Sequence, residues 1–169
     1  MKIDLSQIIK CEGGNISFAD AIRIAPLKLM GETIAFSDEV KIVGNIVNEG
    51  EIFRMQADIK GTMEVRCARC AKPLSREFSV PMSETLVQER DNTDSLHDED
   101  VVVFSGSELE IDTLVENSIF LNLPIKYLCK EDCKGLCPRC GADLNEGNCG
   151  CSQKEIDPRL AVLSKLVEQ

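Results

Sequence analysis

Six of the nine cysteines lie within the twenty-three residues from Cys129 to Cys151. Four of them, Cys137, Cys140, Cys149 and Cys151, follow the C-x2-C and C-x-C spacings of a zinc knuckle. Zn²⁺ binds thiolates in tetrahedral sets of four, and a C-x2-C turn presents two of them on one side of a tight loop. These four cysteines therefore suffice for one tetrahedral metal site, and the rest of the chain is interpreted around it.

Four further cysteines form two pairs. Cys67 and Cys70 make a C-x2-C between two predicted strands, and Cys129 and Cys133 come just before the knuckle. The two pairs supply the four ligands of a second site, which would tie the knuckle to the sheet. We therefore predict two structural zinc ions, with Cys11 left over as the ninth cysteine.

The C-x2-C motifs also leave a redox reading open, because a thiol-redox protein using Cys67 and Cys70 would have the same spacing. A catalytic zinc needs an open coordination position, and two closed sets of four thiolates provide none. We therefore expect structural metal and no enzymatic activity or small-molecule substrate. The only histidine, His97, lies in an acidic stretch and is expected to be solvated.

The composition limits the core and the compartment. Apolar residues make up 43% of the chain but aromatics only 4%, without Trp, so Ile, Leu, Val and Met must fill the core. No apolar run approaches the ~20 residues of a membrane span, so no membrane partner is expected. The first residues lack the apolar stretch of a signal peptide, so a cytoplasmic location is expected, where clustered cysteines favour metal over disulfides.

The net charge of −10 is concentrated in one region. Eleven acids and one base lie between Glu84 and Glu116, so the rest of the chain holds equal numbers of acids and bases. Residues 88–100 are predicted to form a mobile acidic loop. A chain of this charge is a poor match for a phosphate backbone taken as a whole.

Period-two patterns predict an antiparallel sheet in the middle of the chain. Apolar residues alternate with polar ones from Phe53 to Cys67, with a partner strand over Val40–Ile46 and another over Leu74–Met82. Asn48-Glu49-Gly50 has hairpin-turn chemistry, because Asn and Gly tolerate positive φ. The first thirty residues predict one short strand followed mostly by loop, and Val101–Phe104 an edge strand.

A helix is predicted over residues 113–123. Thr113 and Glu116 have capping-box spacing, and Pro124 prevents the helix from continuing. Asp157-Pro158 marks the start of a C-terminal helix. The predicted fold class is α+β: an antiparallel meander, curling toward a partly closed barrel, with a covering helix. Residues 1–128 form this domain, and residues 129–169 form the zinc knuckle and the C-terminal helix.

Several strings of this sequence resemble the YceD family of bacterial proteins. They are Cys133-Lys-Gly-Leu-Cys-Pro-Arg-Cys-Gly with Asp143-Leu-Asn, Asp157-Pro-Arg-Leu, and the upstream Cys67-x2-Cys70-x-Lys-Pro-Leu. The resemblance implies a cytoplasmic, non-enzymatic factor needed for accumulation of large-subunit ribosomal RNA. It also implies a family often encoded beside a small zinc-containing protein of the large ribosomal subunit. It identifies no catalytic residue.

One basic stretch suggests how such a factor meets its partners. The bases around the predicted hairpin tip, which outnumber the acids from residue 60 to 76, are Lys60, Arg66, Arg69, Lys72 and Arg76. They are candidates for contacts with the phosphates of a large-subunit rRNA precursor, while the acidic loop would either repel RNA elsewhere or engage a basic ribosomal protein. A zinc-containing adaptor or transcriptional regulator remains a further alternative.

Overall fold

The computed structural model describes residues 1–29, 31–89 and 101–151. The chain divides into two compact units. The first contains Met1–Arg66 and Pro73–Tyr127, and the second contains Cys67–Lys72 together with the segment from Leu128 onward. His97, nearly all of the predicted acidic loop and the predicted C-terminal helix lie outside the described residues.

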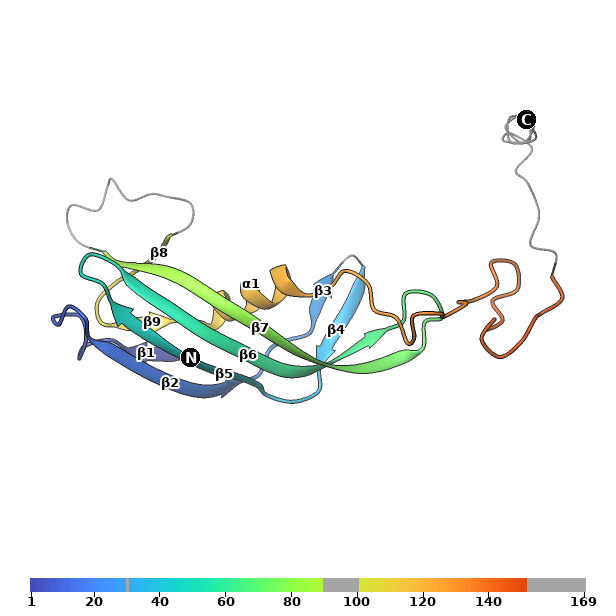
Figure 1. The fold of residues 1–169 in the computed structure, drawn as a ribbon, viewed down its shortest axis with the longest axis horizontal. Helices are drawn as coiled ribbons and strands as arrows, with labels where there is room; N and C mark the ends of the chain where they lie inside the picture. Colours follow the sequence, from blue (N-terminus) through green and yellow to red (C-terminus); the bar gives the residue numbers. More distant parts are fainter. Residues whose placement is uncertain (30, 90–100, 152–169) are drawn as a thin grey trace, which may run out of the picture. The chain divides into compact units, whose positions relative to one another are not determined.

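The first unit is mostly antiparallel β-sheet with one helix (Figure 1). Its elements are β1 Lys2–Asp4, β2 Asn15–Ile22, β3 Leu27–Leu29, β4 Glu32–Phe36, β5 Val40–Asn48, β6 Phe53–Arg66, β7 Pro73–Gln88, β8 Val101–Phe104, β9 Glu108–Glu110 and α1 Asp112–Asn122. Strands β2 to β8 form one seven-stranded sheet, and β1 pairs with β9 in a second, two-stranded sheet.

The predicted meander is confirmed in β5, β6 and β7. Strand β6 pairs with β7 along its whole length, from Phe53 opposite Leu86 to Arg66 opposite Pro73. The odd-numbered side chains of β6 face the core and the even-numbered ones face solvent, as the alternating sequence indicates. Gly50 provides the positive φ of the β5–β6 turn, whereas Asn48 remains in the strand.

The prediction of mostly loop in the first thirty residues is wrong. Strand β2 pairs with β5 over eight residues, from Asn15 opposite Val47 to Ile22 opposite Val40. Its alternation is weak because Ala19 and Ala21 are small and Asp20 interrupts the apolar face. Strand β2 is therefore specified by hydrogen bonding to its neighbour more than by its own pattern.

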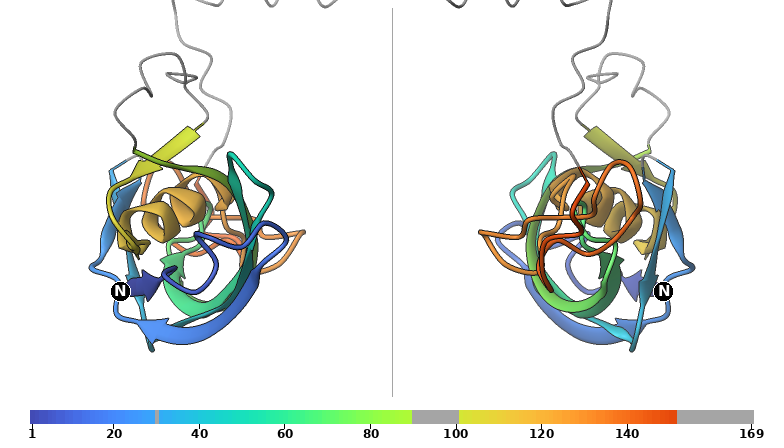
Figure 2. Two further views of the ribbon diagram at one scale, coloured as in Figure 1. Left: turned by 90° about the vertical axis from the view of Figure 1, so that its left-hand side faces the viewer. Right: turned by 90° about the vertical axis from the view of Figure 1, so that its right-hand side faces the viewer.

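The sheet is curved but does not close into a barrel, so that part of the prediction is wrong. Within the described residues, β2 and β3 are the terminal strands on one side of β6. On the other side, β8 is the terminal strand and pairs only with β7. Strand β8 is parallel to β7, whereas the other strand pairings described in the sheet are antiparallel. Figure 2 shows the strands curving around α1.

The core lies between the concave side of this sheet and α1. Side chains of β5 and β6, such as Ile42, Met55 and Ile59, are fully buried together with Val115 and Ile119 of the helix. The helix matches its predicted bounds and ends before Pro124, but Ile111 and not Thr113 is its N-cap residue, without a side-chain cap. The capping-box prediction is therefore wrong.

Candidate metal centres

The first C-x2-C motif forms a knuckle at the tip of the β6–β7 hairpin. The Cys67 N–H donates to the Lys72 carbonyl at 2.9 Å, and the Ala71 N–H donates to the Cys67 carbonyl at 2.8 Å. Ala71 has a φ of 57°, which an L-residue rarely adopts. The turn thus points the Cys67 and Cys70 side chains to the same side.

The second C-x2-C motif repeats this geometry. The Cys137 N–H donates to the Ala142 carbonyl at 2.8 Å, and the Gly141 N–H donates to the Cys137 carbonyl at 2.9 Å. Gly141, with a φ of 73°, takes the place that Ala71 holds in the first knuckle. The two turns therefore have equivalent backbone geometry, and each presents two cysteines.

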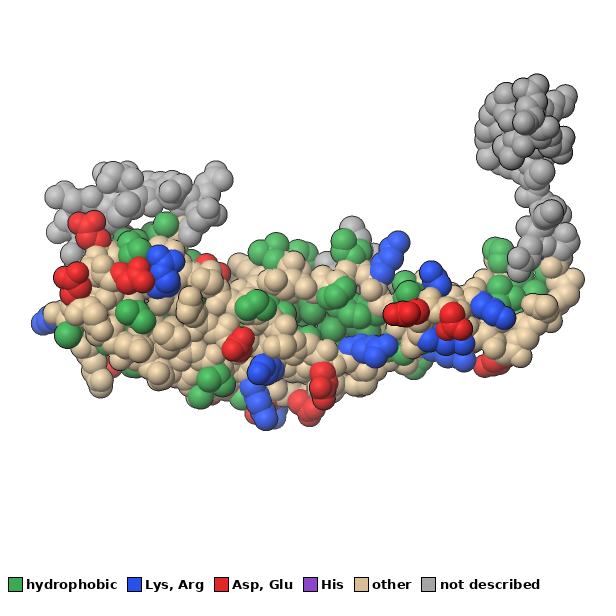
Figure 3. All heavy atoms as spheres, viewed as in Figure 1, with side chains coloured by type: hydrophobic (Ala, Val, Ile, Leu, Met, Phe, Trp, Pro, Cys, Tyr) green, Lys and Arg blue, Asp and Glu red, His purple; other side chains and the backbone are tan. Residues whose placement is uncertain are grey.

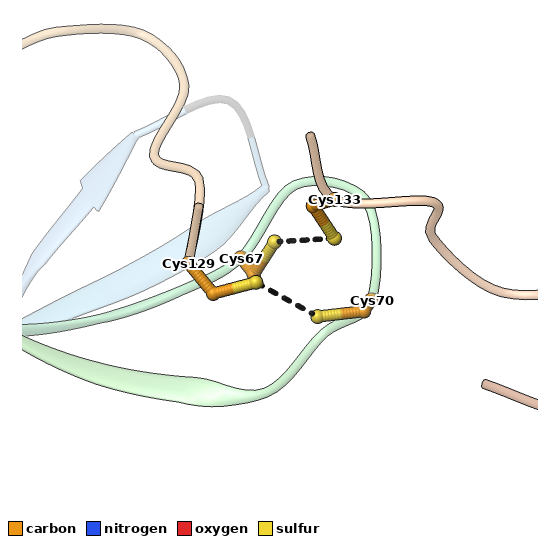
Figure 4. Close-up of side chains that lie close together, drawn as sticks. All are labelled: Cys67, Cys70, Cys129 and Cys133. Carbon is orange, nitrogen blue, oxygen red and sulfur yellow. Dashed lines mark hydrogen bonds between the residues drawn. The ribbon is translucent and has the colours of Figure 1, made fainter. Parts of the chain in front are cut away.

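The predicted pairing of distant cysteines is present in the structure. In the first cluster, Cys67, Cys70, Cys129 and Cys133, all four sulfurs lie within 4.8 Å of one another, and the side chains point toward a common centre (Figure 4). The Sγ atoms of Cys67 and Cys133 are 3.8 Å apart, and those of Cys70 and Cys129 are 3.7 Å apart.

These distances fit a metal ion and not a disulfide. Zn–S bonds of about 2.3 Å in a tetrahedron place the sulfurs about 3.8 Å apart, whereas a disulfide bond is about 2.05 Å long. None of these four cysteines is joined in a disulfide. The first cluster therefore has the donor atoms and the spacing of a four-thiolate metal site.

The second cluster comprises Cys137, Cys140, Cys149 and Cys151, whose sulfurs also lie within 4.8 Å of one another. It is more open than the first cluster. Cys140 is exposed and Cys149 and Cys151 are half-buried, whereas only Cys129 of the first cluster is not fully buried. The sulfur atoms of the second cluster are accordingly more accessible to solvent than those of the first.

In each knuckle, backbone N–H groups lower the pKa of one cysteine thiol. Burial alone would raise the pKa of Cys67, but backbone N–H groups of Cys70 and Arg69 lower the pKa to about 6. The N–H groups of Cys140 and Arg139 likewise lower the pKa of Cys137 to about 6. The first negative charge of each cluster is thus stabilised by the knuckle backbone.

Other thiols of the clusters are harder to deprotonate. Burial and then the neighbouring thiols raise the pKa of Cys129 to about 12, and the thiols of Cys140 and Cys149 raise the pKa of Cys151 to about 12. A divalent cation removes this repulsion and deprotonates the coordinating thiols. The clusters are therefore suited to metal and poorly suited to remain as free thiols.

Arg69 holds the first cluster together from the middle of its knuckle. Its Nη1 donates to the carbonyls of Cys133 and Glu131, at 2.8 and 3.2 Å. Its own carbonyl accepts from the Leu136 N–H at 3.1 Å. Gly135 approaches closely, because a Cβ there would lie 3.0 Å from the Arg69 carbonyl oxygen. Arg69, proposed from sequence to contact RNA, has a structural role here.

Lys72 is also engaged within the second unit. Its Nζ lies 2.9 Å from Asp143 Oδ2 and 3.2 Å from Glu146 Oε1. Lys72 and then Asn145 lower the pKa of Asp143 to about 2, and the two acids raise the pKa of Lys72. The positive charge of Lys72, predicted from the sequence to contact a phosphate, is therefore compensated by two carboxylates.

Asn145 is a site residue that the sequence analysis missed. Its Nδ2 lies 3.5 Å from Cys133 Sγ, and its Oδ1 accepts from the Lys134 N–H at 2.9 Å. The roles of Asp143 and Gly135 at this site were not predicted either. The Asp143-Leu-Asn string after the knuckle was the available signal, since Asp and Asn side chains bind nearby backbone.

The remaining predicted RNA contacts lie on different faces of the sheet. Lys60 and Arg66 belong to the exposed, even-numbered face of β6, whereas Arg76 lies opposite Met63 and so shares the face of the odd-numbered residues. Lys41 of β5, missed from the sequence, lies directly opposite Lys60 on the exposed face. Figure 3 shows basic and acidic side chains interspersed on the surface drawn there. Lys60, Arg66 and Arg76 thus do not share one face of the sheet.

Comparison with known proteins identifies the family of this chain. Residues 55–167 match the family model described as large ribosomal RNA subunit accumulation protein YceD. The chain belongs to the YceD family. The matched region includes both knuckles and all eight clustered cysteines.

Relatives span the chain at low identity. The Mycobacterium tuberculosis protein Rv2926c is 28% identical over 99% of this chain and 80% of its own length. The Bacillus subtilis protein YlbN is 24% identical over 100% of this chain and 98% of its own length. The Arabidopsis thaliana protein named large ribosomal RNA subunit accumulation protein YCED homolog 1, chloroplastic, is 26% identical over 77% of this chain and 49% of its own length.

No solved structure matches this chain. In the part of the chain that the structure describes, no helix has the length and apolar character needed to cross a membrane.

Proposed function

We propose that this protein supports the accumulation or maturation of large-subunit ribosomal RNA in the cytoplasm by binding components of the large subunit, without catalysis. The observation that carries this proposal is the family match, which extends from β6 through the second knuckle. The closed four-thiolate geometry of both clusters favours binding, because it leaves no coordination position for a substrate.

We propose that each cluster binds one structural Zn²⁺. Four thiolates with tetrahedral spacing, joined by no histidine or carboxylate among the described residues, suit Zn²⁺ best of the common divalent metals. Bound metal would fix segments that otherwise have few apolar contacts, since the apolar core of the described residues belongs to the first unit. The zinc ions would thus stabilise the second unit in place of a core.

Charge favours a basic protein as the partner of the second unit. Its described residues carry five basic and four acidic side chains, and two four-thiolate zinc sites would add about −2 each. The metal-loaded unit would be net negative and would repel phosphates. A basic ribosomal protein of the large subunit fits this surface better than rRNA does.

Direct rRNA contact is proposed instead for the exposed face of the sheet. Lys41 and Lys60 are cross-strand neighbours there, and like charges directly opposite each other are destabilising unless an anion compensates them. Arg66 lies further along the same face of β6. These three bases replace the five predicted from the sequence, because Arg69 and Lys72 serve the second unit.

Depletion of the protein in its host tests the function. We expect mature large-subunit rRNA to fall relative to small-subunit rRNA, and wild-type protein to restore it. A variant with Cys70→Ser and Cys133→Ser should fail to restore it. An unchanged rRNA ratio after depletion would contradict the proposal.

Two binding assays separate the partners. The triple variant Lys41→Glu, Lys60→Glu and Arg66→Glu should weaken binding to a large-subunit rRNA precursor, while the matched variant Lys2→Glu, Lys28→Glu and Lys126→Glu should not. Affinity capture at low and high salt should recover basic large-subunit proteins in a salt-dependent manner. Recovery of RNA polymerase or DNA would support the adaptor alternative.

The redox alternative is tested by metal analysis. A thiol-redox protein using Cys67 and Cys70 should be purified without metal and should oxidise readily to a disulfide. We expect two zinc ions per chain and thiols protected from alkylation. Elemental analysis that gives one zinc ion or none would contradict the two-site proposal.

A further inference from the structure

The loop inside the second cluster reaches the first cluster. This loop runs between Cys140 and Cys149 and carries Asn145, whose Nδ2 lies 3.5 Å from Cys133 Sγ. The orientation of the amide is fixed, because its oxygen accepts the Lys134 N–H at 2.9 Å and only oxygen can accept that proton. The amide NH₂ must therefore face the sulfur.

A second tie from the same loop holds the first knuckle. Asp143 Oδ2 lies 2.9 Å from Lys72 Nζ, and Asp143 Oδ1 accepts from Asn145 Nδ2 at 2.6 Å. The Leu144 N–H also donates to the Gly135 carbonyl at 2.9 Å. One loop thus contacts both segments that supply cysteines to the first cluster.

The chemistry of a four-thiolate site makes this contact important. Such a site carries about −2 net charge around a divalent ion, and an N–H donor to a coordinating sulfur offsets part of that charge. Loss of hydrogen-bonding partners behind metal ligands typically lowers metal affinity by about 10- to 100-fold. Asn145 is therefore placed to strengthen metal binding at the first cluster without being a ligand.

The geometry points to an energetic coupling between the two metal sites through Asn145. Metal bound by the second cluster closes the loop between Cys140 and Cys149, and the closed loop presents the Asn145 amide to Cys133. The first cluster reaches full affinity only when the second is loaded, and by reciprocity its own metal strengthens binding at the second. This inference rests on the proposed metal binding.

The solvent exposure of the cysteines indicates which cluster binds metal first. Cys140 is exposed, and the other two ligands that close the loop, Cys149 and Cys151, are half-buried. Three of the four first-cluster cysteines are buried. Metal therefore enters and leaves the second cluster more readily. When the second cluster is loaded, Asn145 acts as a positioning residue that strengthens metal binding at the buried first cluster.

The test compares the affinity of the first site with and without the second. Zn²⁺ affinity is measured in the full chain by competition with a chelator, and Cd²⁺ NMR distinguishes the two sites. Cys140→Ser with Cys149→Ser removes the second site and should weaken the first by about 10-fold. Asn145→Ala, which keeps all eight ligands, should weaken the first site by a similar factor.

Combining Asn145→Ala with removal of the second site tests whether the coupling passes through Asn145. In the Asn145→Ala background, removal of the second site should weaken the first site no further, because the coupling contact is already absent. Asn148→Ala, an exposed change in the same loop, is the matched control and should leave both affinities within about twofold.

Three outcomes would overturn the coupling. They are an unchanged first-site affinity after loss of the second site, an unchanged affinity in Asn145→Ala, or full additivity of the two changes. Each of these leaves two-site zinc binding intact, so the failure is distinct. A wild-type chain that binds fewer than two metal ions would instead contradict the proposed zinc sites, and the coupling with them.

Discussion

Single residues decide how the turns of this protein are held. Asn48 is a buried polar residue whose Nδ2 donates to the Ile8 carbonyl at 2.7 Å and whose Oδ1 accepts from the Gly50 N–H at 2.8 Å. Its backbone also pairs with Gly13 and Gly14. One side chain thus joins the N-terminal turn to the β5–β6 hairpin.

Asn48→Ala should lower the free energy of unfolding of the first unit by about 1–3 kcal/mol, because it removes a buried hydrogen bond to the Ile8 carbonyl and the acceptor of the Gly50 N–H. Chemical denaturation of the metal-loaded protein measures the change. Asn45→Ala, in the same strand but only half-buried, is the control and should change stability by about 0.5 kcal/mol or less. Equal effects of the two variants would contradict the role given to Asn48.

Two glycines of the second unit have positive φ for different reasons. Gly141, with a φ of 73°, has open space where a Cβ would lie, whereas Gly135, with a φ of 77°, approaches the Arg69 carbonyl. Gly141→Ala should weaken the free energy of metal binding by about 1–2 kcal/mol through its unfavourable positive φ alone. Ala71, with a φ of 57°, shows that an alanine can adopt this conformation. Gly135→Ala should cost more, because the added methyl displaces the backbone of the first knuckle.

Zinc affinity of the two variants measures this difference. We expect Gly135→Ala to weaken the first site and Gly141→Ala to weaken mainly the second. A larger loss in Gly141→Ala than in Gly135→Ala would show that the close approach to Arg69 carries no energy.

At the scale of elements, the sheet depends on small residues where strands curve. Gly44 of β5 lies between Phe18 of β2 and Ala57 of β6 in the sheet register. A Cβ at Gly44 would lie 2.5 Å from the Gln56 carbonyl oxygen and 2.8 Å from the Phe18 ring. The ring therefore occupies the space that a side chain would need.

Gly44→Ala should lower the free energy of unfolding by about 1–3 kcal/mol through overpacking. The measurement is thermal or chemical denaturation followed by circular dichroism. Val43→Ala, at the adjacent position and with an exposed side chain, is the matched control and should have an effect of about 0.5 kcal/mol or less. A neutral Gly44→Ala would mean that the strands separate there without cost.

For the whole molecule, we expect stability to be divided between the apolar core and the proposed metal sites. The apolar core lies in the first unit, and the eight clustered cysteines lie in the second. The two units should therefore respond differently to the same treatment. Burial would stabilise the sheet and α1 independently of metal, whereas the proposed metal coordination would stabilise the knuckles.

Removal of metal by a chelator should unfold the second unit and leave the first folded. We expect hydrogen exchange to increase at 67–72 and 128–151, while the buried amides of β5, β6 and α1 remain protected. Re-addition of Zn²⁺ should restore protection. Loss of protection in β6 at the same chelator concentration would show that the two units fold as one.

The sequence by itself determined the parts of this protein that rest on local rules. Alternation in β6 and β7, Pro124 at the end of the helix, and the C-x2-C spacings each act within a few residues, so they could be predicted directly. The pairing of Cys67 and Cys70 with Cys129 and Cys133 was also predicted, by counting ligands.

Only the tertiary structure decided the rest, because it depends on contacts between distant segments. Strand β2 exists through pairing with β5, and the open edges that prevent a barrel follow from strand order. Arg69 and Lys72 looked like surface charges in the sequence, yet their partners Cys133 and Asp143 lie more than sixty residues away. The charge of a residue follows from its type, but the fold determines which groups neutralise that charge.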